Sequence, residues 1–169
     1  HVLRQAETSA DKIALSVLSA DTSQDWTYAA LEQAVRATGA GLLEAGLRPG
    51  DIVLMRLGNT GDFPIAYLGA IAAGLVPVPT SSQLTTAETA QIIADLSPAA
   101  VLRDPAVSCA DHPLEIDLNA LRNMRLGPTC DYAMGDPDRL AYVVYTSGTS
   151  GKSRAVAHAH RAIWARQMM

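Results

Sequence analysis

The chain has 169 residues, of which 49% are hydrophobic and 18% are charged, and its formal net charge is -4. This length and composition fit one globular domain with a sizeable core, and the acidic balance argues against a nucleic-acid surface. The sequence contains no apolar run long enough for a membrane span, and no basic leader followed by an apolar core. Cys109 and Cys130 are widely spaced, which predicts reduced thiols in a cytoplasmic protein.

The first segment predicts a strand followed by a helix. Residues 13–18 form an apolar run of strand length, and a polar turn is expected over residues 21–25. Thr27 carries the hydroxyl of an N-cap, and apolar residues follow it at helical spacing. Gly46 is expected to end this helix, because glycine commonly follows a helix C-terminus.

The next segment predicts a second strand and helix. Residues 48–51 read as a turn, and residues 52–57 are apolar except for one arginine, which indicates a strand. A loop of small residues over 58–62 then leads into a helix that Gly74 ends.

Two prolines in residues 76–79 predict a strand at a sheet edge or strand end, because proline lacks the N–H that a central strand donates. Thr85 and Glu88 have the spacing of a capping box and open a helix that runs to about Leu96. Residues 99–102 are predicted to be another strand.

Residues 103–138 are the least informative part of the sequence. The apolar side chains of residues 114–118 alternate, which favours a strand, and residues 136–138 indicate a turn into an apolar strand over 139–145. Strands that alternate with helices predict an α/β fold with a mostly parallel sheet and helices on both faces. Ligands of such sheets bind beyond the carboxyl ends of the strands.

Small, hydroxylated and cationic residues follow the strand over 139–145. Glycines let the backbone aim its N–H groups at a guest, hydroxyls add donors, and cations neutralise phosphate charge. The sequence therefore predicts a site for nucleotide phosphates. Its candidate binding residues are Thr146, Ser147, Gly148, Thr149, Ser150, Gly151, Lys152 and Arg154.

A Walker A loop is the first alternative for this stretch. That motif requires a glycine five residues before Gly151, where this sequence has Thr146, and a helix directly after the lysine. Residues 154–157 are small and favour a return strand at least as well, which would make the loop the tip of a hairpin. A flexible linker is the second alternative, but a linker lacks a flanking buried strand and paired cations.

The stretch resembles the phosphate loop of adenylate-forming enzymes, a family that includes acyl- and aryl-CoA ligases, luciferases and peptide-synthetase adenylation domains. The family pattern is approximately [YF]-T-S-G-[TS]-[TS]-G-x-P-K-G-V. Residues 145–151 and Val156 match it. Ser153, Arg154 and Ala155 depart from it, standing where proline, lysine and glycine are usual.

Further segments are similar to the same family in order and spacing. They are Trp26-Thr27-Tyr28, residues 46–51, residues 57–59, and the stretch from Ala66 to Pro79. The Val-Pro-Val-Pro ending resembles acyl- and aryl-CoA ligases more than peptide synthetases. The resemblance implies that residues 1–169 are the N-terminal portion of a large AMP-binding domain whose C-terminal lid domain lies outside the sequence.

The resemblance also implies a reaction. A carboxylic acid attacks the α-phosphorus of ATP with Mg²⁺ present, and coenzyme A then takes the acyl group. The acyl pocket and the catalytic lysine of the family lie downstream, so no catalytic residue is assigned here and the chain alone is expected to be inactive. A non-catalytic interaction or folding fragment is the alternative function, and a phosphate binder of the P-loop nucleoside triphosphatase type is a weaker one.

Other chemically capable residues have simpler interpretations. His158 and His160 could bind a metal but lack a spaced partner, so a strand end and a helix start are expected. Asp136 and Asp138 are interpreted as a turn. The remaining candidates are three arginines interpreted as a solvated face, and apolar residues of the last helix that could drive self-association if exposed. They are Arg122, Arg125 and Arg139, and Ile163, Trp164 and Met168.

Overall fold

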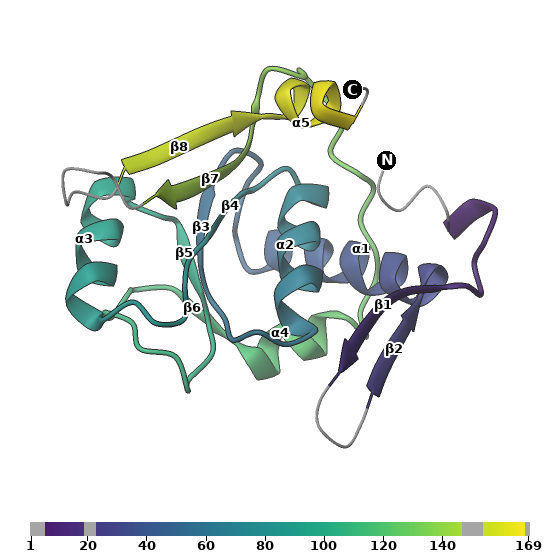
Figure 1. Ribbon diagram of the computed structural model, residues 1–169, viewed down its shortest axis with the longest axis horizontal. Coiled ribbons are helices and arrows are strands. Elements are labelled where there is room, and N and C mark those ends of the chain that lie inside the picture. The colour runs from purple at the N-terminus through teal and green to yellow at the C-terminus, as the bar shows by residue number, and fades with distance from the viewer. Residues whose placement is uncertain (1–5, 19–22, 147–153, 168–169) are drawn as a thin grey trace.

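A parallel sheet of four strands forms the centre of the molecule (Figure 1). The computed structural model describes residues 6–18, 23–146 and 154–167. The strand order is β4–β3–β5–β6, and all three neighbouring pairs are parallel. In that order the strands are Val76–Pro79, Ile52–Arg56, Ala100–Arg103 and Glu115–Asp117. The proline-containing strand β4 lies at one edge of this sheet, as the sequence predicts.

Helices cover both faces of the sheet, which confirms the α/β prediction. The helices are α1 (Tyr28–Glu44), α2 (Asp62–Ala72), α3 (Thr86–Leu96), α4 (Leu118–Met124) and α5 (His160–Gln167). On one face, Leu42 of α1 and Leu121 of α4 pack against Val53 and Met55 of β3. On the other face, Ile92 of α3 contacts the cluster that contains Leu54. Alternate residues of β3 therefore face opposite cores, as expected for a strand buried on both sides.

The helix ends follow the local sequence signals. The Thr27 side chain accepts a hydrogen bond from the Ala30 N–H at 3.2 Å, and Thr85 and Glu88 form both bonds of a capping box. Gly46 and Gly74 have positive φ angles of 97° and 80°, and each follows the C-cap residue of its helix, α1 or α2. These confirmed boundaries agree with the capping signals in the sequence.

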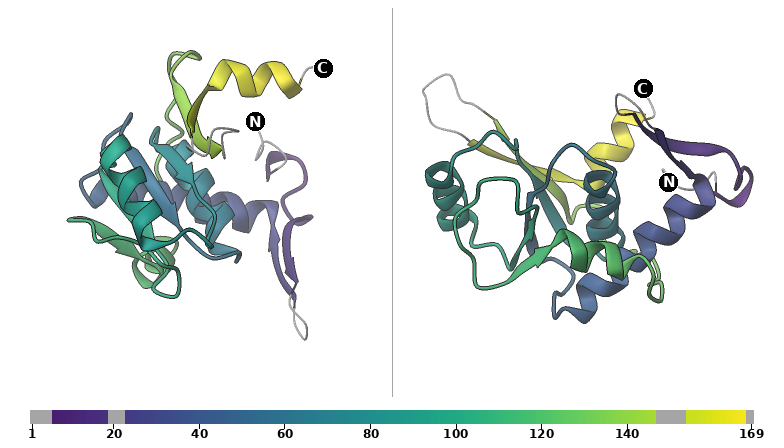
Figure 2. Two further views of the ribbon diagram at one scale, coloured as in Figure 1. Left: turned by 60° about the vertical axis from the view of Figure 1, so that its left-hand side comes forward. Right: turned by 90° about the horizontal axis from the view of Figure 1, so that it is seen from below.

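The prediction of a polar turn over residues 21–25 is wrong for residues 23–25. Ser23–Thr27 form strand β2, which pairs antiparallel with β1 (Ile13–Leu18). The resulting hairpin projects from the body beside α1 (Figure 2). Because β2 exposes most of its side chains, its residues are polar and lack the apolar run that would have identified a strand.

The expected strand over residues 114–118 is shorter than predicted, because Leu118 begins α4. Asp117 is the N-cap of this helix, and its side chain accepts a hydrogen bond from the Ala120 N–H at 2.8 Å. Alternation over a few apolar residues therefore hid a strand-to-helix transition. No helix in the described ranges is both long and apolar enough to cross a membrane.

Candidate nucleotide-phosphate site

Strands β7 (Leu140–Thr146) and β8 (Arg154–Ala159) flank the predicted phosphate loop as an antiparallel pair. Tyr145 lies opposite Ala155, and Thr146 lies opposite Arg154, so the pairing continues to the last residue on each side of the loop. This confirms the predicted return strand and hairpin. A Walker A loop would instead require a helix where β8 lies.

Two of the eight predicted phosphate-binding residues lie in the described part of the chain. Thr146 ends β7, and Arg154 begins β8 as an exposed residue. The other six, residues 147–152, lie outside the described residues. The structure thus describes the two ends of the candidate loop and the strands that carry it.

Strand β7 does not join the parallel sheet, although the alternation of strands and helices in the sequence predicts a single, mostly parallel sheet. In the described residues it pairs with β8 alone, and its inner face packs against β4. Val143 is buried in the cluster that contains Val76 and Val78 of β4 and Ile92 of α3. Ala141 and Val143 are buried, whereas Tyr142 and Val144 are half-buried. The Tyr142 ring contacts Tyr67 of α2 edge-on, with the ring centres 6.2 Å apart.

Tyr145 fixes the base of the candidate loop against α3. It packs against the cluster of Val143 and Ile92, and its pKa is raised, first by burial and then by the negative charge of Asp95. The loop therefore begins from a residue held by α3 and by the core.

Arg56, the one charged residue of β3, lies fully buried near the carboxyl end of the sheet. Its guanidinium donates to Thr80 Oγ1 at 3.0 Å, to the carbonyls of Ser81 and Leu84, and through Nε to the Ser108 carbonyl at 3.0 Å. Burial is the main reason that its pKa is lowered from the ordinary arginine value. Open α/β sheets often bind ligands beyond the carboxyl ends of their strands. At the carboxyl end of β3, the Arg56 side chain and its partners occupy this position.

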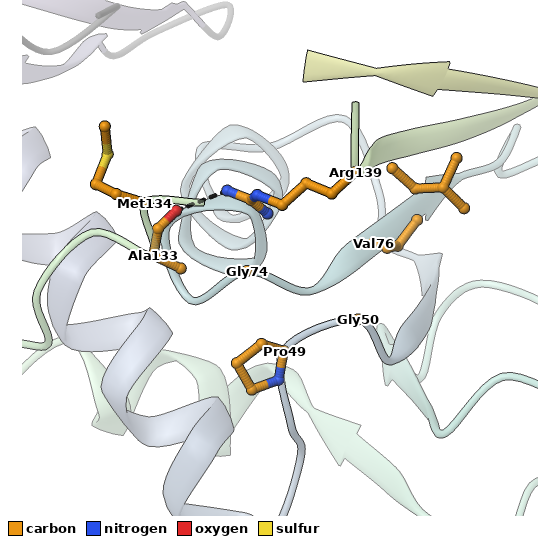
Figure 3. A pocket seen from close by; sticks show the side chains of 8 residues that line it. Pro49, Gly50, Gly74, Val76, Ala133, Met134 and Arg139 are labelled. Atoms are coloured by element: carbon orange, nitrogen blue, oxygen red, sulfur yellow. Dashed lines mark hydrogen bonds between the residues drawn. The ribbon is translucent and has the colours of Figure 1, made fainter. Parts of the chain in front are cut away.

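A cavity of about 370 Å³ lies at the other end of β7, close to Leu140 (Figure 3). Arg139 extends across it and donates to the Ala133 carbonyl at 2.6 Å. Pro49, Gly74 and Val76 contribute to the lining. This cavity is separated from the candidate loop by the length of strand β7.

The prediction that Arg122, Arg125 and Arg139 form a solvated face is wrong for Arg125 and Arg139, whereas the Arg122 side chain is 54% exposed. Arg139 has the backbone contact described above. Arg122 and Arg125 both bind the carboxylate of Asp62, at 2.8 Å and 2.6 Å. Asp62 is only 5% exposed and lies in the first turn of α2. The regular spacing of the two arginines in the sequence gave no indication of a buried acidic partner about sixty residues away.

Asp62 keeps its charge although it is buried. Burial acts to raise the pKa of its carboxyl group, but hydrogen bonds and charges from Arg122 and Arg125 outweigh burial and lower the pKa. The sequence signals that could have identified this group are an acidic residue in the first turn of a helix and two arginines three positions apart. Both signals are common on protein surfaces.

The remaining histidine and aspartate candidates from the sequence lie in secondary-structure elements or in a turn. His158 lies in β8 and His160 begins α5, as the simpler interpretation predicts, and no metal-binding group was found among the described residues. Asp136 forms a turn, in which its carboxylate accepts from the Asp138 N–H at 2.8 Å. Cys109 and Cys130 are both free thiols. Trp164 on α5 is 56% exposed, and Met168 lies outside the described residues.

Comparisons with known proteins bear on the whole chain. A model of the family described as AMP-binding enzyme matches residues 2–169. The chain is 32% identical over 163 residues to the phenyloxazoline synthase MbtB of Mycobacterium tuberculosis, covering 94% of this chain and 11% of that protein. It is 30% identical over 158 residues to the 4-hydroxybenzoate–CoA/benzoate–CoA ligase of Rhodopseudomonas palustris, covering 83% of this chain and 29% of the ligase.

Solved structures share the fold at lower identity. The N-terminal subdomain of Klebsiella oxytoca NpsA, in complex with 3-hydroxybenzoyl-AMSN, matches with a TM-score of 0.80 at 22% identity and covers 95% of this chain and 40% of that one. The fatty acyl-adenylate ligase of L. pneumophila, in complex with acyl adenylate and pyrophosphate, matches with a TM-score of 0.79 at 24% identity. That match covers 98% of this chain and 31% of the other.

The chain thus spans between about a tenth and a third of the length of the curated relatives that it matches here. The family match extends from residue 2 to residue 169 and includes the hairpin that carries the candidate phosphate loop. The chain therefore belongs to the family of AMP-binding, adenylate-forming enzymes.

Proposed function

We propose that this chain supplies one wall of the ATP site in an enzyme that activates carboxylic acids. The observation that carries the proposal is the β7–β8 hairpin. It joins a buried strand to a return strand through a connection rich in glycine, serine and threonine, with cations at its end. Membership of the AMP-binding family supports the same assignment.

In the proposed reaction, a carboxylate oxygen attacks the α-phosphorus of ATP. A bond forms between that oxygen and phosphorus, the bond to the β-phosphate bridging oxygen breaks, and pyrophosphate leaves with the electron pair. The acyl-adenylate that forms has a good leaving group, whereas the free carboxylate does not. The enzyme must hold two anions together and stabilise the charge of the departing pyrophosphate.

The loop residues are suited to that charge. We assign the hydroxyls of Thr146, Ser147, Thr149 and Ser150 as donors to phosphate oxygens, and Gly148 and Gly151 as positions of close backbone approach. Lys152 and Arg154 would neutralise the β- and γ-phosphates. Mg²⁺ would be held largely by the phosphate oxygens, as is usual for this ion, and would further reduce the charge repulsion.

We propose coenzyme A as the acceptor in the second half-reaction, in which its thiol displaces AMP from the acyl group. The match to a benzoate–CoA ligase supports this choice. The alternative is that the acyl group goes to another acceptor, or that the adenylate is itself the product. Similar proteins that are named as a synthase or an acyl-adenylate ligase favour that alternative.

The proposed activity belongs to a longer protein that contains residues 1–169. The chain alone is proposed to be inactive, because it spans only part of its relatives, and a role as an interaction or folding fragment is the alternative. The half-exposed Trp164 leaves self-association of the chain as a prediction that sedimentation can test. A cytoplasmic location likewise stays a prediction.

The test measures ATP–pyrophosphate exchange by the longer protein with a panel of aromatic and aliphatic acids. Exchange with at least one acid is expected. Replacing Arg154 by alanine should lower kcat/KM for ATP by about 100-fold, the typical effect of removing one group that stabilises developing charge.

Arg161→Ala is the matched control, because Arg161 is also an exposed arginine near this hairpin and lies outside the candidate loop, where it pairs with Asp138. It should leave exchange almost unchanged. Equal losses in the two variants, or no exchange with any acid, would contradict the proposal. For the chain alone, detection of an acyl-adenylate by mass spectrometry would overturn the proposed inactivity.

A further inference from the structure

A second cavity of about 410 Å³ lies between the β1–β2 hairpin, the loop before α2, and helix α4. Its volume falls within the range of small-molecule sites. No residue of β7 or β8 contributes to its lining. The lining residues are Val17, Gln24, Trp26, Thr60, Gly61, Asp62, Arg122 and Arg125.

The cavity carries more positive than negative charge. Arg122 and Arg125 share the single carboxylate of Asp62, which accepts from Arg122 Nε at 3.2 Å and NH2 at 2.8 Å, and from Arg125 NH2 at 2.6 Å. Asp104 interacts more weakly with Arg122 and already accepts from the Ala106 N–H. Among the lining side chains, two guanidinium groups therefore share one carboxylate, while the charge of Asp104 acts on Arg122 from outside the lining.

Two donors of the cavity wall lack acceptors in the described chain. The indole N–H of Trp26 and the Nε–H of Arg125 are both buried and have no hydrogen-bond partner there. The two side chains face each other, because the Arg125 Cζ lies 5.9 Å from the centre of the Trp26 ring. Buried donors without acceptors are uncommon and costly, so their pairing in one cavity indicates a missing acceptor.

The absence of a side chain at Gly61 leaves space in the cavity. Gly61 begins the loop side of the cavity, and a Cβ built on it would lie 3.7 Å from Trp26 Nε1 and 3.6 Å from Gln24 Oε1. Both are ordinary contact distances. A methyl group would therefore fit, and it would occupy volume next to the unpaired indole N–H.

We propose that this cavity binds a small oxyanion with one unit of negative charge, carried by a carboxylate or a phosphate group. The anion balances the excess charge of Arg122 and Arg125, and its oxygens accept from the indole N–H of Trp26 and from the arginines. The site is formed by the N-terminal hairpin and α4, so it is separate from the proposed nucleotide loop and does not depend on the proposed reaction.

The test follows the two indole N–H signals of the ¹⁵N-labelled chain by NMR. The sequence has only two tryptophans, Trp26 and Trp164. Trp164 lies on α5 and is 56% exposed, so it serves as an internal reference. Sodium phosphate and sodium acetate are titrated in separate experiments, with sodium chloride at matched ionic strength as the comparison. Trp164→Phe assigns the two signals.

A saturable shift of the Trp26 signal, with the Trp164 signal unchanged, is expected. A response to phosphate alone assigns a phosphate-bearing ligand, a response to acetate alone assigns a carboxylate, and a response to both supports a general oxyanion site. An equal response to chloride, a parallel shift of Trp164, or no saturable response would overturn the proposal.

Two variants test the geometry. Arg122→Gln removes the excess charge while Arg125 still pairs with Asp62, and it should weaken binding about tenfold. Gly61→Ala keeps every charge but fills space, and it should also weaken binding. Gly135→Ala is the matched control, because its added Cβ would meet only Arg139, at 3.8 Å. Unchanged affinity in both test variants would refute the assignment of this cavity.

Discussion

Replacing Asp62 by asparagine tests whether its bonds to two arginines stabilise the fold. The substitution keeps the size of the side chain and removes its charge. Asp62 is 5% exposed and lies within 2.8 Å of both guanidinium groups, so the variant removes the carboxylate charge that both cations share. Removal of one partner from a buried ion pair is strongly destabilising.

The structure sets the expected magnitude. Removing one partner of a buried pair costs about 3–5 kcal/mol of unfolding free energy. Arg125 is 11% exposed and cannot easily regain water, whereas Arg122 is 54% exposed and can. The loss should therefore lie near the lower end, at about 3 kcal/mol.

Urea unfolding followed by circular dichroism measures the effect, and Asp138→Asn is the control. Asp138 also pairs with an arginine, Arg161, at 2.6 Å, but both side chains are 61% exposed. The control should barely move the unfolding midpoint, because surface ion pairs contribute little. Equal midpoints for the two variants would refute the reasoning.

The pH dependence gives a second check on Asp62. Burial acts to raise the pKa of this carboxyl group, but the two arginines outweigh it, so the folded-state pKa is lower than the unfolded one. Its contribution to stability is complete above the unfolded-state pKa of about 4, and it is lost as the pH falls through the folded-state pKa. The difference between the wild-type chain and Asp62→Asn should therefore be largest at neutral pH and shrink in acid.

Three further predictions concern the scaffold. Gly74→Ala should destabilise the fold more than Gly46→Ala, by about 1 kcal/mol or more. Both glycines have positive φ, but only at Gly74 would an added Cβ meet another atom closely, Ala133 Cβ at 2.9 Å. Equal losses of stability in thermal unfolding would contradict the effect assigned to this clash. Thr85→Ala should cost about 1 kcal/mol through the lost capping box, while Thr86→Ala, one residue later, should cost less. Burial raises the pKa of Tyr67 and of Tyr132 to about 12, and the pKa of Tyr145 is also raised. An alkaline absorbance titration should therefore show Tyr67 and Tyr132 ionising last among the five tyrosines, and Tyr67→Phe should remove one of these two late steps.

Sequence reasoning succeeded where a boundary depends on neighbouring residues alone. The hydroxyl of Thr27, the Thr85–Glu88 pair and the glycines at 46 and 74 act within one turn of a helix, and the structure places all of them as predicted. The hairpin at the candidate loop was also predictable, because a strong apolar strand and a short run of small residues flank it.

Sequence reasoning failed where a contact joins distant parts of the chain. The charges of Arg122 and Arg125 look like a solvated surface until the fold brings Asp62 against them. The apolar run of β7 indicates a strand but does not indicate which sheet the strand joins. A strand that packs against β4 needs apolar residues just as a strand inside the parallel sheet does. Strand β2 was missed because an exposed hairpin strand needs no apolar residues.

The buried guanidinium of Arg56 has a consequence for how helix α3 opens. Its bonds reach Ser81 and Leu84 before that helix and Ser108 after it, so one side chain holds the chain on both sides of α3. Thr89 of α3 adds a hydrogen bond to the segment after the helix, because its hydroxyl accepts from the Ala110 N–H at 2.9 Å. Local unfolding of α3 that displaces these flanking segments would leave the buried guanidinium unpaired, which links the hydrogen exchange of α3 to that of the sheet. The segment that supports Tyr145, and with it the base of the candidate loop, should exchange as one cooperative unit with β3.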